Sequence, residues 1–345
     1  MSFSRRPIKP YVIFSVLGIA LITSFVAALC LGAVPLSTVD IWRGLWEENS
    51  TSSALIVQHI RLPRALLALV IGATLALCGC VTQSLFRNPL ADPSLIGVSA
   101  GASVGASVAI FLGAGSYSAS AISSIDISIV SLAAFAGGAL AVLFVYRLST
   151  TAFGTSVPTM LLAGIAIGAI AGSLGSLLEY YSNNEDLRRM SLWRMGGLDS
   201  ANMMSVGIAA SVMLLSAVFL QLKASALDAL LLGESEARHL GIPVNSLKVT
   251  LILIVAVGVG LSVAIAGLIG FVGLVVPHMV RLTLGPGHRL LLPCSALSGA
   301  ILLCVADTLA RTIAAPAELP VGLLTALLGA PVFISLLRQG AANRV

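Results

Sequence analysis

The sequence predicts an all-α, polytopic membrane protein with about ten transmembrane helices, and three observations support this fold class. The 345 residues are 58% hydrophobic and 10% charged, and the mean hydropathy is +1.04. A soluble domain carries about 25% charged residues because its surface faces water, so most of this surface must face lipid. Apolar runs of membrane-crossing length recur along the whole chain. They leave no space for a sizeable soluble domain, and we expect a single transmembrane domain, residues 1–345.

The apolar runs define the expected helices in order. The first run follows the basic residues 5–9 and is too long for the core of a signal peptide, so we interpret it as a spanning helix. In the fifth run, Gly164, Gly168 and Gly172 share one helix face with G-x-x-x-G spacing, which lets helices approach closely. The eighth run is short. The expected spans are residues 11–33, 62–86, 94–114, 126–147, 158–178, 203–222, 247–266, 269–284, 290–310 and 320–338.

The distribution of basic residues predicts the orientation. With the N-terminus inside and ten spans, the inner segments carry most of the 19 Lys and Arg residues. An excess of Lys and Arg marks cytoplasmic loops, so we expect both termini in the cytoplasm. The formal charge of +5 is modest and is spread over short segments, which argues against binding to nucleic acid.

Other residue types exclude several functions. The five cysteines, Cys30, Cys78, Cys80, Cys294 and Cys304, lie in or beside apolar runs, where thiols act as small hydrophobes. Cys78 and Cys80 have a spacing found in metal sites but lack nearby partners, so we predict no metal or cofactor in this chain. No series of acidic residues or histidines crosses the membrane, as proton-coupled carriers require. The chain also lacks a G-x-x-x-x-G-K-[ST] nucleotide loop. We therefore expect a transport permease, not an enzyme, whose energy comes from another chain unless transport is passive.

The longest polar stretch of the inner side is residues 222–248, LKASALDALLLGESEARHLGIPVNSLK. Residues 226–240 have helical apolar spacing, with Gly241 and Pro243 as end signals. Such a helix either lies in the membrane interface or fits a groove on a soluble partner. Interfacial helices favour Lys and Arg, whereas acidic residues prevail here, so the composition favours the soluble partner. The charged residues of the predicted helix are Asp228, Glu234, Glu236 and Arg238.

Three arginines lie on the expected outer side, against the excess of basic residues on the inner side. Arg61 and Arg64, in the sequence RLPR, lie at the expected outer mouth of the second span, and Arg311 lies at the outer end of the ninth. A local explanation is available, because Asp307 is one helical turn from Arg311 and Arg61 can extend to the interface. The alternative is a landing surface for an acidic partner, since Arg pairs with carboxylates in bidentate fashion.

The inner loop at residues 87–93, RNPLADP, contains Asn-Pro and Asp-Pro, which are turn-forming pairs. The pattern favours a simple turn between two spans. A rigid turn at the inner mouth of a pore can also serve as a gate, and the sequence leaves that possibility open.

Several segments resemble the permease family of ABC importers for iron complexes and cobalamin. The likeness runs from about residue 60 to the C-terminus, and the order of the segments agrees. The segments are RLPRALLALVIGATLALCGCVTQSLFRNPLADPSLIGVSAGAS, LLGESEARHLGIPV, IGFVGLVVPHMVRL and ADTLARTIAAPAELPVGLLTALLGAPVFISLL. The resemblance implies the type II ABC importer permease fold, with ten helices in each subunit. It also implies a homodimer around a central pathway, a cytoplasmic ABC ATPase dimer that holds ATP and Mg, and an extracytoplasmic substrate-binding protein.

The resemblance also implies roles for particular residues. Residues 226–241 would be the coupling helix that enters the ATPase, and the outer arginines would pair with acidic residues of the binding protein. The cytoplasmic gate would consist of the NPLA turn and the start of the fifth helix. At the second place this chain departs from relatives that have small hydroxyl residues, although apolar side chains can also seal a pore. The implied residues are Asp228, Glu234, Arg238 and Gly241 for coupling, Arg61, Arg64 and Arg311 for docking, and Asn88, Leu90, Val157 and Pro158 for the gate.

The identity of the transported cargo is the most detailed prediction from the sequence. Residues 189–197 resemble heme-type members slightly more than siderophore-type ones. Trp193 could stack on a flat macrocycle, but tryptophan is common at membrane interfaces. We expect import of an iron complex across the cytoplasmic (inner) membrane, with heme first and a ferric siderophore next. Import of cobalamin and a self-sufficient secondary transporter are the alternatives.

Overall fold

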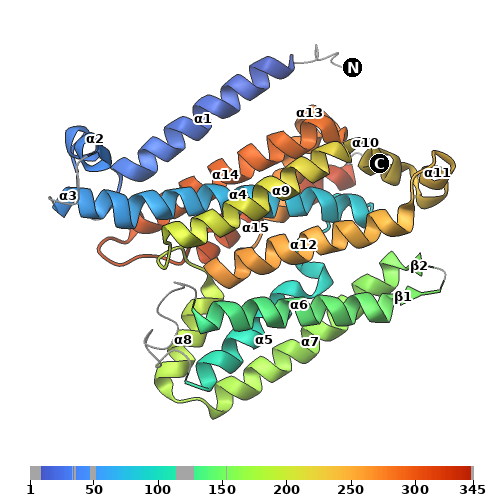
Figure 1. Cartoon of the computed structure of the whole chain (residues 1–345), viewed down its shortest axis with the longest axis horizontal. Coiled ribbons are helices and arrows are strands. Elements are labelled where there is room, and N and C mark those ends of the chain that lie inside the picture. The colour runs from blue at the N-terminus through green and yellow to red at the C-terminus, as the bar shows by residue number, and fades with distance from the viewer. Residues whose placement is uncertain are drawn as a thin grey trace.

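The computed structural model describes residues 9–32, 34, 36–46, 52–113, 128–152 and 154–342 and has the predicted all-α architecture (Figure 1). Seven helical segments are long and apolar enough to cross a membrane, and three shorter apolar helices accompany them. They correspond in order to the expected spans. The long segments are α1 (Pro10–Cys30), Ser52–Leu85, α6 (Ile129–Ser149), α7 (Val157–Tyr181), α9 (Met203–Leu222), α12 (Val244–Ala266) and α14 (His288–Ile313). The shorter ones are α5 (Val98–Phe111), α13 (Val272–Leu284) and the segment Val321–Ser335 of α15 (Val321–Ala342).

The second span starts earlier than the prediction of 62–86. Helix α3 (Ser52–Leu55), the π-helical turn η1 (Ile56–Arg61) and α4 (Leu62–Leu85) run on as one helical segment. Pro63 lacks a backbone N–H, and a π-helical turn before it absorbs the interrupted hydrogen-bond ladder. The RLPR sequence therefore lies inside a helix and not at its mouth.

The third and eighth spans are shorter than the predicted 94–114 and 269–284. At the third, the Asp92 side chain accepts a hydrogen bond from Ser94 N at 2.8 Å and begins the short 3₁₀ helix η2 (Pro93–Ile96). Gly97 then adopts a left-handed conformation (φ +82°), so α5 begins only at Val98. At the eighth, Phe271 is left-handed (φ +66°) and α13 begins at Val272. Residue 114 lies outside the described residues.

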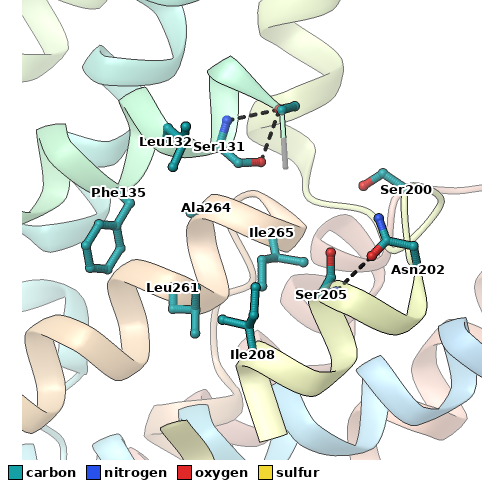
Figure 2. A pocket seen from close by; sticks show the side chains of 11 residues that line it. Ser131, Leu132, Phe135, Ser200, Asn202, Ser205, Ile208, Leu261, Ala264 and Ile265 are labelled. Carbon is teal, nitrogen blue, oxygen red and sulfur yellow. Dashed lines mark hydrogen bonds between the residues drawn. The ribbon is translucent and has the colours of Figure 1, made fainter. Parts of the chain in front are cut away.

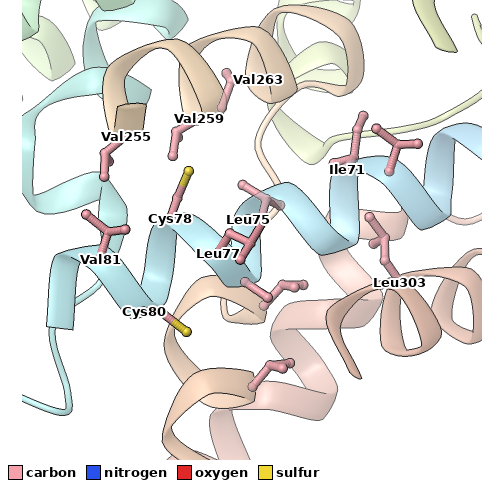
Figure 3. Packing of buried hydrophobic residues seen from close by; sticks show 14 of the residues in the cluster. Ile71, Leu75, Leu77, Cys78, Cys80, Val81, Val255, Val259, Val263 and Leu303 are labelled. Carbon is pink, nitrogen blue, oxygen red and sulfur yellow. The ribbon is translucent and has the colours of Figure 1, made fainter. Parts of the chain in front are cut away.

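Helix α4 forms the centre of the hydrophobic core and packs against α9, α12, α13 and α14. Figure 3 shows Cys78 directed toward Val255 and Val259 of α12, while Cys80 points to the other side of α4. Both thiols are free and buried. Glycine lets the backbone of α4 approach that of α14 closely, because a Cβ at Gly72 would lie 2.2 Å from the carbonyl oxygen of Gly299.

Helix α7 lies at the edge of the bundle, and most of its surface is open. Only part of its glycine face packs within the chain. A Cβ at Gly164 would lie 2.0 Å from the oxygen of Leu95, whereas Gly168, Gly172 and Gly175 have no such neighbour within 4 Å among the residues described. The close approach predicted from the G-x-x-x-G spacing is thus confirmed for Gly164 alone.

The two ends of the bundle carry different elements (Figure 1). One end holds α10 (Ala224–Leu232), α11 (Glu234–His239) and the hairpin of β1 (Thr150–Thr151) and β2 (Gly154–Thr155). The start of α1 and the C-terminal end of the chain lie at the same end. We call it the inner end, after the predicted orientation. The opposite, outer end carries α2 (Thr38–Trp46), α3 and α8 (Asn184–Met195). The termini themselves, residues 1–8 and 343–345, lie outside the described residues, and their cytoplasmic location stays a prediction.

Candidate functional site

The inner end presents the predicted coupling helix, but as two helices. Gly233, at φ +125°, separates α10 from α11, and this conformation strongly favours glycine. The prediction of one continuous helix over 226–240 was therefore wrong, because the apolar spacing continues across a residue whose backbone breaks the ladder. Gly241 (φ +80°) follows the end of α11, as expected of an end signal. We call residues 224–241 the coupling segment.

The first half of this segment is bonded to two membrane helices. Asp228 Oδ1 in α10 accepts a hydrogen bond from the backbone N of His288 at 2.9 Å and lies 2.6 Å from its Nδ1. The opposite ring nitrogen, Nε2, lies 2.6 Å from Ser84 Oγ in the last turn of α4. His288 and Ser84 are both fully buried. Asp228 thereby satisfies part of the first turn of α14, where free N–H groups favour a carboxylate.

The second half is bonded to the start of α12 and to the hairpin. Glu234 Oε1 in α11 pairs with Lys248 Nζ at 2.6 Å. The same ammonium donates to the carbonyl oxygen of Thr155 in β2 at 2.7 Å. Glu234 also contacts Arg238 across one turn at 3.5 Å. Arg238 is mostly exposed, so α11 presents a cationic side chain at the surface, while Glu234 is fixed by its ion pair with Lys248.

The NPLA turn is fixed by Asn88. Its Oδ1 accepts from Leu90 N at 3.0 Å, and its carbonyl oxygen accepts from Ala91 N at 3.1 Å. Arg87 adopts a left-handed backbone (φ +47°) at the end of α4. The structure therefore contains the turn that the sequence favoured. Asn88 is exposed and Leu90 is half-buried at the inner end of α4.

Val157 and Pro158, the other predicted gate residues, form the first turn of α7. Ser156 caps this helix, with its Oγ accepting from Thr159 Oγ1 at 2.8 Å. Ser156 N also donates to Ser149 O at 2.8 Å, which ties the start of α7 to the end of α6, next to the β1–β2 hairpin. Separate contacts thus position the two predicted gate segments, and gating by either one stays a prediction.

Two of the three outer arginines, Arg64 and Arg311, share a buried ionic cluster, whereas Arg61 binds backbone carbonyl groups. Arg64 Nε and Arg311 Nε bind the two carboxylate oxygens of Asp307 at 2.9 and 3.1 Å. Arg64 also pairs with Glu318 at 2.7 Å. Arg61 donates to the carbonyl oxygens of Leu29, at 2.6 Å, and Cys30 at the end of α1.

The arginine cluster has a structural role in this state of the chain. The last carbonyl groups of a helix lack partners within the helix, and Arg61 together with Arg311 satisfies those of α1. The local explanation for Arg311 is therefore confirmed by its pair with Asp307. Arg61, Arg64 and Arg311 are each no more than 5% exposed. Glu318 is the accessible member of the cluster, and docking of a partner on the arginines stays a prediction.

A small cavity opens near the outer end between α6, α9 and α12 (Figure 2). Its polar rim includes Ser131, Asn202 and Ser205, and Phe135 and Leu261 supply part of its apolar wall. The volume of about 200 Å³ is smaller than the ~300–1,000 Å³ typical of ligand pockets. Trp193, the residue suggested for macrocycle stacking, is half-buried and packs against the core. Neither feature provides a resident site for a bulky cargo.

Sequence reasoning missed the buried basic residues of the inner end. Lys248 entered the sequence analysis only through the count of basic residues on the inner side, and His288 belongs to no motif recognised in the sequence. The available signal is position: each stands in the first helical turns of a long apolar span, where an ionisable side chain must find a partner. Those partners come from segments far away in the sequence, so no local spacing identifies them. Glu318 was missed for the same reason.

Comparisons with known proteins agree with this architecture. A family model described as the FecCD transport family matches residues 20–339. The hemin transport system permease protein HmuU of Yersinia pestis is 42% identical, over 98% of each chain. The cobalamin import system permease protein BtuC of Halobacterium salinarum is 43% identical, over 84% of this chain and 74% of the relative. A solved structure of a metal-chelate type ABC transporter in an inward-facing conformation has a TM-score of 0.81 at 32% identity, covering 96% of this chain and 99% of that one.

Proposed function

This chain belongs to the FecCD transport family and is a multi-pass ABC importer permease, and we propose that its cargo is heme. The observation that carries the proposal is the likeness to the hemin permease of Yersinia pestis over 98% of both chains. A ferric siderophore is the next candidate, in line with the metal-chelate type transporter of similar structure. Cobalamin is the alternative that the BtuC relatives favour.

ATP hydrolysis belongs to a separate cytoplasmic ABC ATPase dimer that binds the coupling segment. Two features support this assignment. The chain has no nucleotide-binding loop of its own. The coupling segment buries Leu227, Leu230 and Ala237 while Glu236 and Arg238 stay exposed, as a docking helix requires. ATP and Mg are therefore bound by the partner, and the permease converts its motion into alternating access.

A second copy of the chain completes the transport pathway. The open face of α7 supports this arrangement, because Ile165, Leu174 and Leu177 are exposed beside the unpacked glycines. A smooth apolar wall with few charges suits a bulky complex that must pass without being held. Lipid covers the remaining apolar surface, and the permease lies in the cytoplasmic (inner) membrane with both termini in the cytoplasm.

A substrate-loaded binding protein delivers the cargo at the outer end. Arg61, Arg64 and Arg311 supply positive charge there, and Glu318 is the exposed member of their cluster. Because the arginines are buried, docking on them requires Glu318 to move aside so that acidic residues of the binding protein take its place on Arg64. The inner gate, formed by Asn88, Leu90, Val157 and Pro158, then opens on the opposite side.

Stimulation of ATP hydrolysis identifies the cargo. The permease is reconstituted with its ATPase and binding protein in nanodiscs, and hemin, a ferric hydroxamate siderophore or cobalamin is added in turn. We expect hemin to give the largest rise in hydrolysis. A larger response to cobalamin or to the siderophore refutes heme and leaves the importer assignment in place. If no loaded binding protein changes the rate, the ATP-driven mechanism itself fails.

A further inference from the structure

The coupling segment is linked to membrane helices that are not its neighbours in the chain. By sequence, α10 continues from α9, and α11 leads into α12. The hydrogen bonds reach further: through His288 they connect α10 to the end of α4, and through Lys248 they connect α11 to the hairpin before α7. Each half of the coupling segment therefore contacts one buried basic side chain, and each basic side chain contacts a different inner segment.

Burial makes the Lys248 connection stiff. The side chain is 3% exposed, and two of its three donors are used by Glu234 and Thr155. Removing one partner from a buried charge pair is strongly destabilising because the other charge is left without compensation. A displacement of α11 that carries Glu234 must therefore carry Lys248 and Thr155 with it, or leave a buried ammonium unpaired. Thr155 directly precedes Ser156, the cap of α7.

The His288 connection holds in either protonation state of the ring. If Ser84 donates to Nε2, the ring is neutral and its Nδ1–H donates to Asp228. If Ser84 instead donates to the carbonyl oxygen of Cys80, 2.8 Å away, its Oγ accepts a hydrogen bond from the Nε2–H of a cationic ring. Both ring nitrogens stay bonded in each case. Ser84 is one helical turn before Asn88, so the connection ends at the NPLA turn.

We propose that Lys248 and His288 are positioning residues that carry motion of the coupling segment to two different gate segments. Lys248 transmits the motion of α11 to the start of α7 at Val157, and His288 transmits the motion of α10 to the NPLA turn at Leu90. The inference rests on the proposed function, because that motion comes from the ATPase. It assigns one gate segment to each half of the coupling segment.

Cysteine labelling tests this division. Leu90→Cys and Val157→Cys reporters are placed separately in a Cys30→Ser background, since Cys30 is the partly exposed native cysteine and the other four are buried. The permease is bound to its ATPase in nanodiscs, and the rate of labelling by a hydrophilic maleimide is measured with and without ATP and vanadate. In the parent background we expect the rate at each reporter to change by about tenfold, a typical size for coupling between sites.

The variants should then separate the two reporters. Lys248→Met abolishes the nucleotide response of the Val157→Cys reporter and leaves that of Leu90→Cys intact, and His288→Gln does the reverse. Lys223→Met and His59→Gln are the matched controls, because both side chains are exposed and lie outside the two connections, the coupling segment and the gate segments. We expect both controls to keep both responses.

Each other outcome is decisive. If the parent responds and both variants keep both responses, or if either variant abolishes both, the inference is overturned while the importer assignment stands. If the parent itself does not respond although the ATPase is bound, the proposed function fails. Should Lys248→Met or His288→Gln not assemble, Glu234→Ala and Asp228→Ala remove the accepting carboxylates of the same connections from the partly exposed side. They should give the same divided pattern.

Discussion

At the residue scale, ionisable side chains in this protein are placed where two or more distant segments meet. Asp307 binds Arg64 and Arg311 at the outer end, and Lys248 binds Glu234 and Thr155 at the inner end. Most of each side chain is withdrawn from water, so their energy depends on the partners and not on solvent. Substitution of these side chains should therefore lower the stability of the fold or break the contact between the segments that they join.

Arg311→Met should destabilise the permease. It removes one of the two arginines on the buried Asp307 and leaves the carbonyl oxygen of Ala28 without its donor. Breaking a buried ion pair from one side costs about 3–5 kcal/mol, so the Tm of the solubilised permease should fall by several degrees or more. Arg188→Met is the matched control, because this arginine is exposed at the outer end. An unchanged Tm for Arg311→Met would contradict the structural role of this residue.

Arg238→Ala should weaken binding of the ATPase. Arg238 is exposed on α11 and is the cation that this helix offers to a partner. Loss of one well-placed charged contact is worth about 1.4 kcal/mol, or about tenfold in affinity. Titration of the ATPase onto the permease in nanodiscs measures the change, with Arg289→Ala, an exposed arginine at the start of α14, as the control. Equal affinities for Arg238→Ala and the parent would remove α11 from the contact.

At the scale of elements, close helix packing depends on a few glycines. The α4–α14 contact places Gly72 and Gly299 so near that a side chain on either one meets the backbone of the other helix. The α7 glycines beyond Gly164 have open space instead. Glycine therefore permits close helix packing at the α4–α14 contact, whereas the later α7 glycines have no packed neighbour among the described residues.

Gly72→Ala should disrupt the packing of α4 on α14. The added Cβ would lie 2.2 Å from the oxygen of Gly299, well inside van der Waals contact, and overpacking of this kind costs about 1–3 kcal/mol or more. We expect a lower Tm and a lower yield of monodisperse protein. Gly207→Ala in α9, where a Cβ meets nothing within 4 Å, should leave both unchanged. A Tm for Gly72→Ala equal to that of the parent would contradict the packing described for α4.

Within the part of the chain that the structure describes, hydropathy predicted the order and approximate limits of the apolar helices, because the lipid environment imposes a length on every apolar run. It did not predict where the backbone departs from a helix inside or beside those runs. Gly97, Gly233 and Phe271 shorten or divide elements through their positive φ angles. At the sites, spacing identified Asp228, Glu234 and Arg238 as residues of an exposed segment. It could not identify Lys248, His288 or Glu318, whose partners come from elsewhere in the fold.

At the scale of the whole molecule, the proposed function makes this chain one of two permease copies that enclose the pathway and act with a separate ATPase. Its open α7 face implies a second copy, so the solubilised permease should have twice the chain mass of 35.3 kDa. Native mass spectrometry or light scattering corrected for detergent measures this directly. A stable, active complex that contains one permease chain would contradict the proposed pathway.

In the proposed function, transport requires an ATPase carried by another chain, and cargo uptake measures this requirement. Proteoliposomes contain either the permease alone or the permease with its ATPase, and hemin-loaded binding protein is added from outside. We expect hemin accumulation only where the ATPase and enclosed ATP are both present, and none with the permease alone. Accumulation by the permease alone, at a rate unaffected by ATP, would show a self-sufficient carrier and contradict the account.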